Sequence, residues 1–342
     1  MLRHPPPFPI LINYRASSWT VKKDNLALAL MRHRSRVRGI TLRRPYTNIE
    51  KFFTALSYPF PELESLEICP PNDRGRALVL PATSHPDAYP SATSLVELAL
   101  TLRVAHIARP EASLLTNLQR MSCLRRLELN VVEWPNINPT RTYPPASAGD
   151  VVSLSKLTHL LFSGHRLYLQ ALVVGLAAPS LQHLDAEVCG YPHGFPGPIP
   201  HLCKFICDTE CQFTTVRLGL SYTKFRFYAC TGPQSDDNPP FRITRLNPVS
   251  LEEMGQELSR PLSTVEELIV AWDVEKLQTE GRIQTNQWRG FCYHVPQVKM
   301  VRVSATLALD VAHSFQQEGG EPIPNLLPTL ERVERGNGQD AL

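Results

Sequence analysis

A short phrase, L-x-x-L-x-h, in which h is apolar, returns along almost the whole chain. Its two central copies are the segments Leu154–Phe162 and Pro179–Ala186, and the apolar run Leu167–Ala178 between them has the length of a helix. The spacing suits a chain that turns inward at the first leucine and then runs a short strand whose alternate side chains enter a core. A unit of one strand and one helix cannot bury its apolar face alone. The phrase therefore predicts a stack of such units.

The other copies follow each other at fairly even intervals. They begin at Val37, Leu63, Leu95, Leu124, Phe213, Val265, Val298 and, more weakly, Leu330. Successive copies start 24 to 33 residues apart, except for one interval of 52, and this suits a strand, a return helix and two connections. We therefore predict an α/β solenoid, with a curved parallel sheet on its inner face and helices on its outer face. It would form one domain over residues 1–335, followed by a frayed tail over 336–342.

The long interval and the shorter ones also carry local signals. Two alternating runs, Lys224–Tyr228 and Phe241–Leu246, flank a turn-rich linker, which predicts a hairpin inserted over residues 219–250. Helical spacing of apolar residues predicts helices between the strands. Their segments begin near Asp24, Leu114, Leu167, Ile199 and Trp288.

Charge is distributed unevenly along the chain. The net charge is only +3, but the first fifty residues hold ten Lys and Arg against Asp24 and Glu50. The basic run Arg32–Arg38 fits a nuclear-import or phosphate-binding patch, or cations at the C-terminal end of a helix. The second reading is favoured because no aromatic residues are interleaved with the run. We therefore do not expect a nucleic-acid partner.

Signals for chemistry are weak. His201, Cys203, Cys207 and Cys211 resemble a metal set, but thiols eight residues apart on one helix lie roughly 12 Å apart along its axis. We therefore expect structural thiols, no metal and no cofactor. The sequence has no catalytic signature, so we do not expect an enzyme. It also has no apolar run long enough for a membrane span. The scattered cysteines favour an intracellular location, cytoplasmic or nuclear.

The predicted stack implies a binding surface on its inner, concave face. In each phrase, the residue between the last two apolar positions should point away from the core. The residue just before the first of those two positions should do the same. The candidate residues for binding a protein partner there are Glu67, Glu97, Arg126, Glu128, His159, Leu161, His183, Asp185, Arg217, Ile269 and Arg302. Leu161 and Ile269 would be apolar anchors within a polar rim. The alternative is an ordinary solvated sheet face without a partner.

Three segments resemble the leucine-rich-repeat region of mushroom-type (basidiomycete) fungal F-box proteins. They are Pro9–Arg15, Phe52–Leu66 and Ala178–Leu184. The resemblance implies a leucine-rich-repeat-like solenoid that serves as the substrate-binding part of an SCF-type ubiquitin-ligase adaptor. In that family an F-box before the equivalent of Pro9 binds Skp1, but only eight residues precede Pro9 here. Skp1 is therefore not expected as a partner of this chain. The alternatives are a free-standing scaffold without a ligase link and, third, an enzyme of unknown class.

Overall fold

The computed structural model describes most of the predicted strands and several helices. It covers residues 8–15, 24–43, 56, 58–69, 93–104, 111–133, 151–189, 199–208, 214–221, 224–230, 255–256, 259–272, 285–304, 311–313 and 327–336. The chain divides into two compact units, Met1–His159 with Gly175–Ala178, and Leu160–Val174 with Pro179–Leu342. The single continuous domain over residues 1–335 stays a prediction, and residues 337–342 of the predicted tail lie outside the described part.

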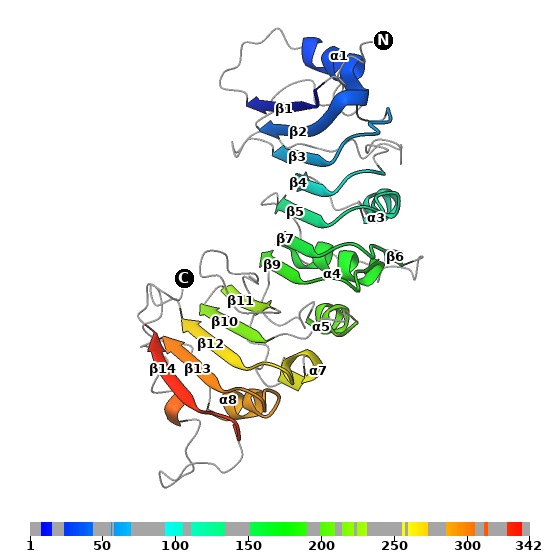
Figure 1. Ribbon diagram of the computed structural model, residues 1–342. Helices are drawn as coiled ribbons and strands as arrows, with labels where there is room; N and C mark the ends of the chain where they lie inside the picture. Colours follow the sequence, from blue (N-terminus) through cyan, green and yellow to red (C-terminus); the bar gives the residue numbers. More distant parts are fainter. Residues whose placement is uncertain are drawn as a thin grey trace, which may run out of the picture. The chain divides into compact units, whose positions relative to one another are not determined.

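The first unit contains five successive parallel strands. They are β1 (Ile10–Arg15), β2 (Val37–Arg43), β3 (Ser65–Cys69), β4 (Glu97–Val104) and β5 (Arg126–Glu133). Each pairs with the next in parallel orientation. The helical segments are α1 (Asp24–His33), the short 3-10 helix η1 (Arg34–Arg36) and α3 (Glu111–Gln119). A small parallel pair joins β6 (Val152–Ser153) to β8 (Leu176–Ala177). In Figure 1 helix α3 lies to one side of β4 and β5.

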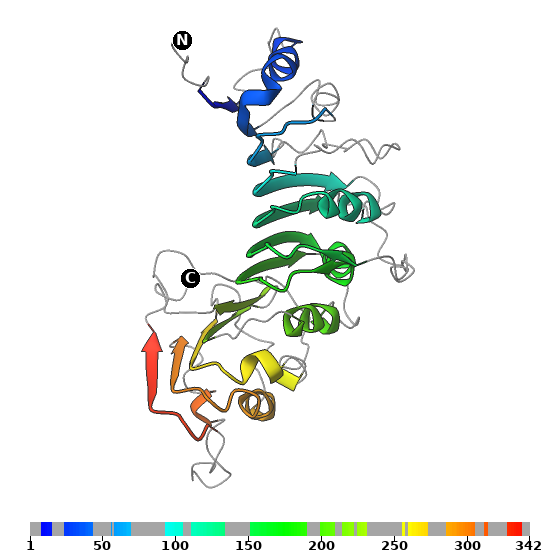
Figure 2. The ribbon, with the colours of Figure 1, turned by 45° about the vertical axis from the view of Figure 1, so that its right-hand side comes forward.

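The second unit holds the later strands and helices. Its elements include β7 (His159–His165, of which His159 belongs to the first unit), α4 (Arg166–Gly175, of which Gly175 belongs to the first unit), β9 (His183–Cys189), α5 (Ile199–Cys207), β10 (Thr215–Ser221) and β11 (Lys224–Cys230). They continue with α7 (Ser259–Leu262), β12 (Glu267–Trp272), α8 (Thr285–Cys292), β13 (Met300–Ser304) and β14 (Arg332–Gly336). Helices α7 and α8 lie to one side of β12 and β13 in both ribbon views (Figures 1 and 2).

The strands form two main sheets with a simple order. The seven-stranded sheet runs β1-β2-β3-β4-β5-β7-β9, and the five-stranded sheet runs β11-β10-β12-β13-β14. The strands that carry the phrase follow each other in sequence order, as a stack of repeats requires. The predicted α/β class and the repeated parallel strand are confirmed. The curvature of the sheet stays a prediction.

The apolar positions of the phrase form the core. In the copy that begins at Leu63, Leu63, Leu66 and Ile68 are at most 1% exposed, and Val298, Val301 and Val303 of a later copy are at most 2% exposed. Alternate side chains of a strand point to opposite faces, so each strand delivers its second and third apolar residues to the same side. The last copy is the exception, because Val333 on β14 is 56% exposed.

A turn ahead of several of the described strands extends the phrase. The N–H of Leu63 donates to the Phe60 carbonyl at 3.2 Å, and the N–H of Leu124 donates to the Met121 carbonyl at 3.0 Å. Phe60 and Met121 are buried, so an apolar residue three positions before the first leucine belongs to the repeat. The repeat therefore reads h-x-x-L-x-x-L-x-h, with its first turn packed into the core.

One backbone carbonyl joins each copy to the next. The Glu64 carbonyl accepts from the N–H groups of Val96 and Glu97 at 2.8 and 2.9 Å. The Glu266 carbonyl likewise accepts from the next copy, from Lys299 and Met300 at 2.8 and 3.1 Å. Because the same two-donor contact recurs, neighbouring copies are held in one register where their strands begin.

The inserted hairpin differs from the prediction. The strand predicted over Lys224–Tyr228 exists as β11, but it pairs antiparallel with β10, from Thr215↔Cys230 to Ser221↔Lys224. Only two residues separate these strands in sequence, so closing this hairpin restricts the chain less than pairing across the long linker would. The predicted partner, Phe241–Leu246, lies outside the described residues.

Candidate binding face

The strands of the first unit leave one sheet face without buried leucines. Burial alternates along β3 in the pattern half-buried, buried, half-buried, buried, half-buried. Among the side chains that the structure describes on β2 to β5, those that point away from the core are exposed or half-buried, apart from Gly39. We call this side of the sheet the open face.

The open face is arranged in rows across the strands, as the sequence predicted. Ser65 is opposite Glu97, which is opposite Arg126. Glu67 is opposite Ala99, which is opposite Glu128. The second unit repeats the arrangement, with Thr215, Glu267 and Met300 in one row and Arg217, Ile269 and Arg302 in another. Identical spacing in successive phrases thus places residues of equal position side by side.

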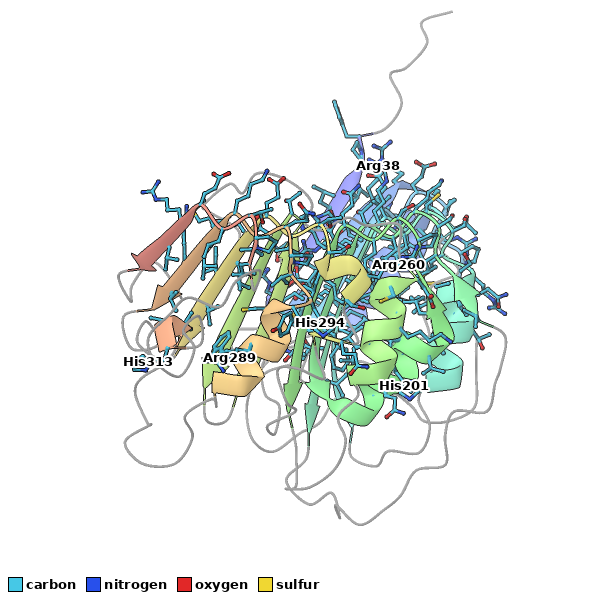
Figure 3. The ribbon with its side chains drawn as sticks, turned by 90° about the horizontal axis from the view of Figure 1, so that it is seen from below. Arg38, His201, Arg260, Arg289, His294 and His313 are labelled. Atoms are coloured by element: carbon cyan, nitrogen blue, oxygen red, sulfur yellow. The ribbon has the colours of Figure 1, made fainter. Side chains whose placement is uncertain are left out.

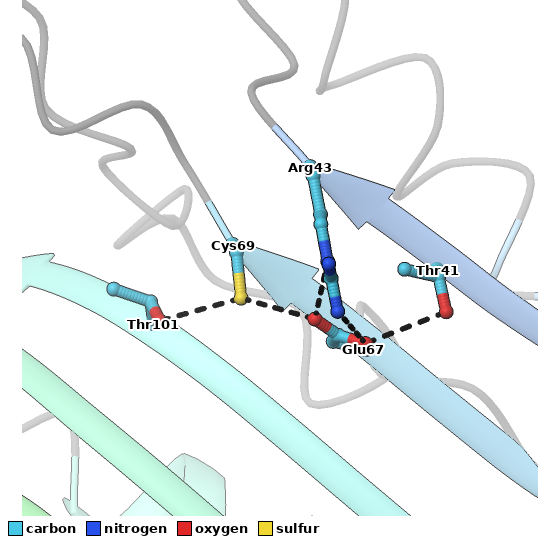
Figure 4. A network of polar contacts seen from close by, with 5 residues as sticks. All are labelled: Thr41, Arg43, Glu67, Cys69 and Thr101. Carbon is cyan, nitrogen blue, oxygen red and sulfur yellow. Dashed lines mark hydrogen bonds and ion pairs between the residues drawn. The ribbon is translucent and has the colours of Figure 1, made fainter. Parts of the chain in front are cut away.

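A polar network centred on Glu67 spans three strands of the first unit (Figure 4). Arg43 on β2 donates twice to Glu67 on β3, with Nε 2.9 Å from Oε1 and Nη2 3.4 Å from Oε2. Thr41 Oγ1 donates to Glu67 Oε2 at 3.5 Å. The hydrogen bond to Glu67 and its negative charge raise the pKa of Arg43. A two-point pair of this kind fixes the plane of the guanidinium group.

Cys69 extends the network towards β4. Its thiol donates to Glu67 Oε1 at 3.6 Å, and Thr101 Oγ1 donates to its sulfur at 3.8 Å. Burial raises the pKa of Cys69, the charges of Glu67 and Glu128 raise it further, and the hydrogen bond from Thr101 opposes them. The thiol therefore stays protonated at neutral pH and is not an activated nucleophile.

The next strands continue the pattern of charges. Arg126 and Glu128 on β5 form an ion pair at 3.2 Å between Nη2 and Oε2. Glu97 on β4 is exposed, and His159 is half-buried, with Nδ1 2.8 Å from Thr158 Oγ1. The first unit thus brings five predicted site residues onto one face, namely Glu67, Glu97, Arg126, Glu128 and His159.

The second unit has a related pair around Glu267. Arg302 Nη1 lies 3.3 Å from Glu267 Oε1, which is an ion-pair contact without the angle of a directed hydrogen bond. Thr215 is only 6% exposed and donates through Oγ1 to Glu267 Oε2 at 3.4 Å. Arg302 is on the strand next to that of Glu267, two residues beyond the position opposite Glu267. Arg43 is likewise two residues beyond the position opposite Glu67.

The predicted exposure of one anchor is wrong. Ile269 is only 7% exposed, so little of its side chain is accessible to a partner. Its row neighbour on β13 is Arg302, whose guanidinium reaches back to Glu267 on the strand of Ile269.

The structure describes the remaining predicted binding residues in less detail. Leu161 on β7 and both His183 and Asp185 on β9 are half-buried and alternate with buried neighbours, as predicted. Arg217 lies in β10 opposite Ile269, and its side chain is outside the described part of the structure. Whether these residues contact a partner stays a prediction.

Sequence reasoning missed part of the face. Thr41 stands in the row of Glu67 but was not among the predicted residues, and Arg43 and Thr101 stand two positions beyond that row; the three complete the network around Glu67. Strand alternation with a period of two would have found them, because a strand of seven residues such as β2 continues past the phrase.

The metal-like cluster of the sequence lies partly on helix α5. The predicted helix at Ile199 exists as α5 and contains both Cys203 and Cys207, whereas Cys211 lies outside the described residues. In the part of the chain that the structure describes, no group of three His, Cys, Asp or Glu could hold a metal ion. His201, His294 and His313 lie well apart (Figure 3). The absence of a metal and of a cofactor stays a prediction.

No helix among the described residues combines the length and the apolar character that crossing a bilayer requires.

The fold and the open face define an α/β repeat protein with in-order parallel strands. No protein-family model matches the chain, and no curated protein matches it. Among solved structures it is similar to the leucine-rich repeat-containing protein LegL7 from Legionella pneumophila, with a TM-score of 0.37 and 11% sequence identity. The match covers 94% of this chain and 89% of that chain. The resemblance to fungal F-box proteins has no counterpart in these comparisons.

Proposed function

We propose that the chain is a non-catalytic protein-recognition module and that a partner protein binds to the open face. The observation that supports this most is the row of paired charges across β2 to β5. Most all-parallel sheets have both faces covered by helices. Here the face carries Arg43 and Glu67, Arg126 and Glu128, and the exposed Glu97.

The charges on this face are held in place before any partner binds. Arg43 is fixed by two contacts to Glu67, and Arg126 is fixed by Glu128. Groups that are already ordered lose little conformational freedom on binding, and this favours affinity. Among the charged residues named on this face, Glu97 has no opposite charge in a described ion pair, so it favours a Lys or Arg on the partner.

The absence of catalysis is part of the proposal. Cys69 is the thiol in the network, and its surroundings favour the protonated form over the reactive thiolate. The other members, Thr41, Arg43, Glu67 and Thr101, hold one another through hydrogen bonds and present no arranged nucleophile with a base. The network is therefore better suited to recognition than to reaction.

The finer form of the proposal is a substrate-binding part of an SCF-type ubiquitin-ligase adaptor inside the cell. Its support is the resemblance of three segments to fungal F-box proteins, together with free thiols at Cys69, Cys123, Cys207 and Cys292, which suit a reducing compartment. A free-standing scaffold is the alternative. Co-precipitation with purified Skp1 tests the adaptor: binding would support it, because a free-standing scaffold has no reason to bind Skp1.

A charge reversal on the open face tests the binding proposal. Glu97→Lys adds a cation where we expect the partner's cation, and Gln119→Lys adds a cation at the exposed end of α3, with half the change in charge. Proteins captured from lysate by the wild-type chain should be lost with Glu97→Lys and kept with Gln119→Lys. Equal capture by both variants would move the binding surface away from this face.

A further inference from the structure

A second surface lies where β1 and β2 begin, away from the open face. It combines exposed apolar and aromatic side chains with arginines from α1 and η1. Its members are Phe8, Leu28, Arg32, Arg34, Arg36 and Tyr58, and we call it the arginine edge.

Direct contacts connect the strand and η1 parts of this edge. Arg36 donates to the Phe8 carbonyl through Nη2 at 2.9 Å and through Nε at 3.3 Å. The guanidinium carbon of Arg34 lies 6.0 Å from the centre of the Tyr58 ring, at the distance of a cation–π contact. The basic run and the aromatic residues therefore meet in space although they are apart in sequence.

The apolar members are more exposed than helix packing requires. On α1, Leu30 is fully buried and provides the contact with the core, whereas Leu28 is 68% exposed. Arg32 is one turn after Leu28 and shares its face of the helix. Phe8 is 81% exposed and Tyr58 is 45% exposed. Large exposed apolar side chains within a polar surface are typical of interaction sites.

The arginines differ from their neighbour Arg38 in their partners. Arg38 lies 3.8 Å from Glu62 and 3.7 Å from Glu64, so its charge is balanced locally. Within the described residues, Arg32, Arg34 and Arg36 form no ion pair with a carboxylate. Arg34 and Arg36 are nevertheless positioned, one by an aromatic ring and one by a carbonyl. Guanidinium groups held in this way can bind carboxylates at two points.

We propose that the arginine edge docks an acidic segment of a partner protein in which carboxylates are interspersed with large apolar side chains. The three arginines bind the carboxylates, while Phe8, Leu28 and Tyr58 contact the apolar residues. Charge complementarity favours an acidic partner, since the first fifty residues carry ten cations against two anions. Leu28 favours a polypeptide over a nucleic acid, because bases stack on aromatic side chains and an aliphatic side chain offers no such surface.

The test uses the full chain and a short fluorescent peptide in which Glu alternates with Leu and Phe, read by anisotropy. The double variant Arg32→Glu with Arg34→Glu should weaken binding at least about tenfold, because both charge contacts become repulsive. The matched control is Lys204→Glu with Arg260→Glu, which changes the net charge equally at exposed sites of the second unit (Arg260 is labelled in Figure 3). It should bind the peptide like the wild type. Circular dichroism melting verifies that both variants are folded.

Two further probes decide between classes of ligand. A peptide with Ser in place of Leu and Phe should bind more weakly, since the apolar contacts are lost. A single-stranded DNA oligonucleotide should bind more weakly than the acidic apolar peptide. Equal peptide binding by both double variants, no measurable peptide binding, or tighter binding of the oligonucleotide that depends on Arg32 and Arg34 would each overturn the proposal.

Discussion

Arg43 and Glu67 form a two-point ion pair between neighbouring parallel strands, with Nε 2.9 Å from Oε1 and Nη2 3.4 Å from Oε2. The two residues are not opposite each other in register, because Arg43 is opposite Cys69. The pair therefore runs diagonally across the open face and leaves Thr41 and Cys69 to complete the shell of Glu67. A related diagonal contact joins Arg302 to Glu267, with the arginine on the following strand instead of the preceding one.

Exchanging the charges of Arg43 and Glu67 tests whether binding of a partner depends on which of the two residues is the cation. Arg43→Glu or Glu67→Arg alone places like charges together and should lower the melting temperature slightly. The double variant restores an opposite pair, so its melting temperature should return towards the wild-type value. Partner capture should remain impaired because the order of charges is reversed. Wild-type capture by the double variant would show that the partner does not contact this pair.

Adjacent residues on β5 should respond very differently to truncation. Leu127 is fully buried, so Leu127→Ala should lower the free energy of unfolding by roughly 2–5 kcal/mol. The side chain of Glu128 is 44% exposed, so Glu128→Ala should change it by no more than about 0.5 kcal/mol. Urea denaturation measures both. A large loss for Glu128→Ala would place that side chain in the core and invert the strand.

Gly255 is required by the close approach of α8. A Cβ atom at this position would lie 3.2 Å from the Phe291 Cα and 2.8 Å from His294 Cδ2. Phe291 is fully buried, so its backbone cannot move away easily. Gly255→Ala should therefore cost about 1–3 kcal/mol of stability by overpacking. The exposed neighbour change Gln256→Ala is the control and should be nearly neutral in the same denaturation experiment.

Burial of Cys292 should make stability depend on alkaline pH. Burial raises the pKa of Cys292 from 9.0 to about 12. The folded state favours the protonated thiol. The stability that this thiol contributes is therefore fully present below pH 9 and is lost as the pH rises towards 12. The stability difference between the wild type and Cys292→Ala should therefore shrink across this range. A constant difference in melting temperature from pH 8 to pH 11 would contradict the buried thiol.

The sequence predicted the repeat better than the face that the repeat presents. The positions of Leu66, Leu98 and Leu127 follow from a spacing that has one physical solution, which is a strand with one buried side. The rows containing Glu67 and Glu128 follow from the same spacing.

The contacts that the sequence did not predict depend on how far side chains extend across the sheet. Ile269 has the right position for an exposed row, yet its side chain is only 7% exposed. Arg43 and Thr101 fall outside the phrase and come into contact only through Glu67 and Cys69. The pairing of β11 with β10 was missed because alternation marks a strand and does not name its partner.

Site-specific photo-crosslinking tests the binding role of the open face most directly. A crosslinking amino acid replaces Ala99, which lies between Glu67 and Glu128 in one row, or Gln119 at the exposed end of α3. With the partner captured by the wild-type chain, illumination should give a covalent adduct at position 99 and none at position 119. An adduct at position 119 together with none at position 99 would contradict the account.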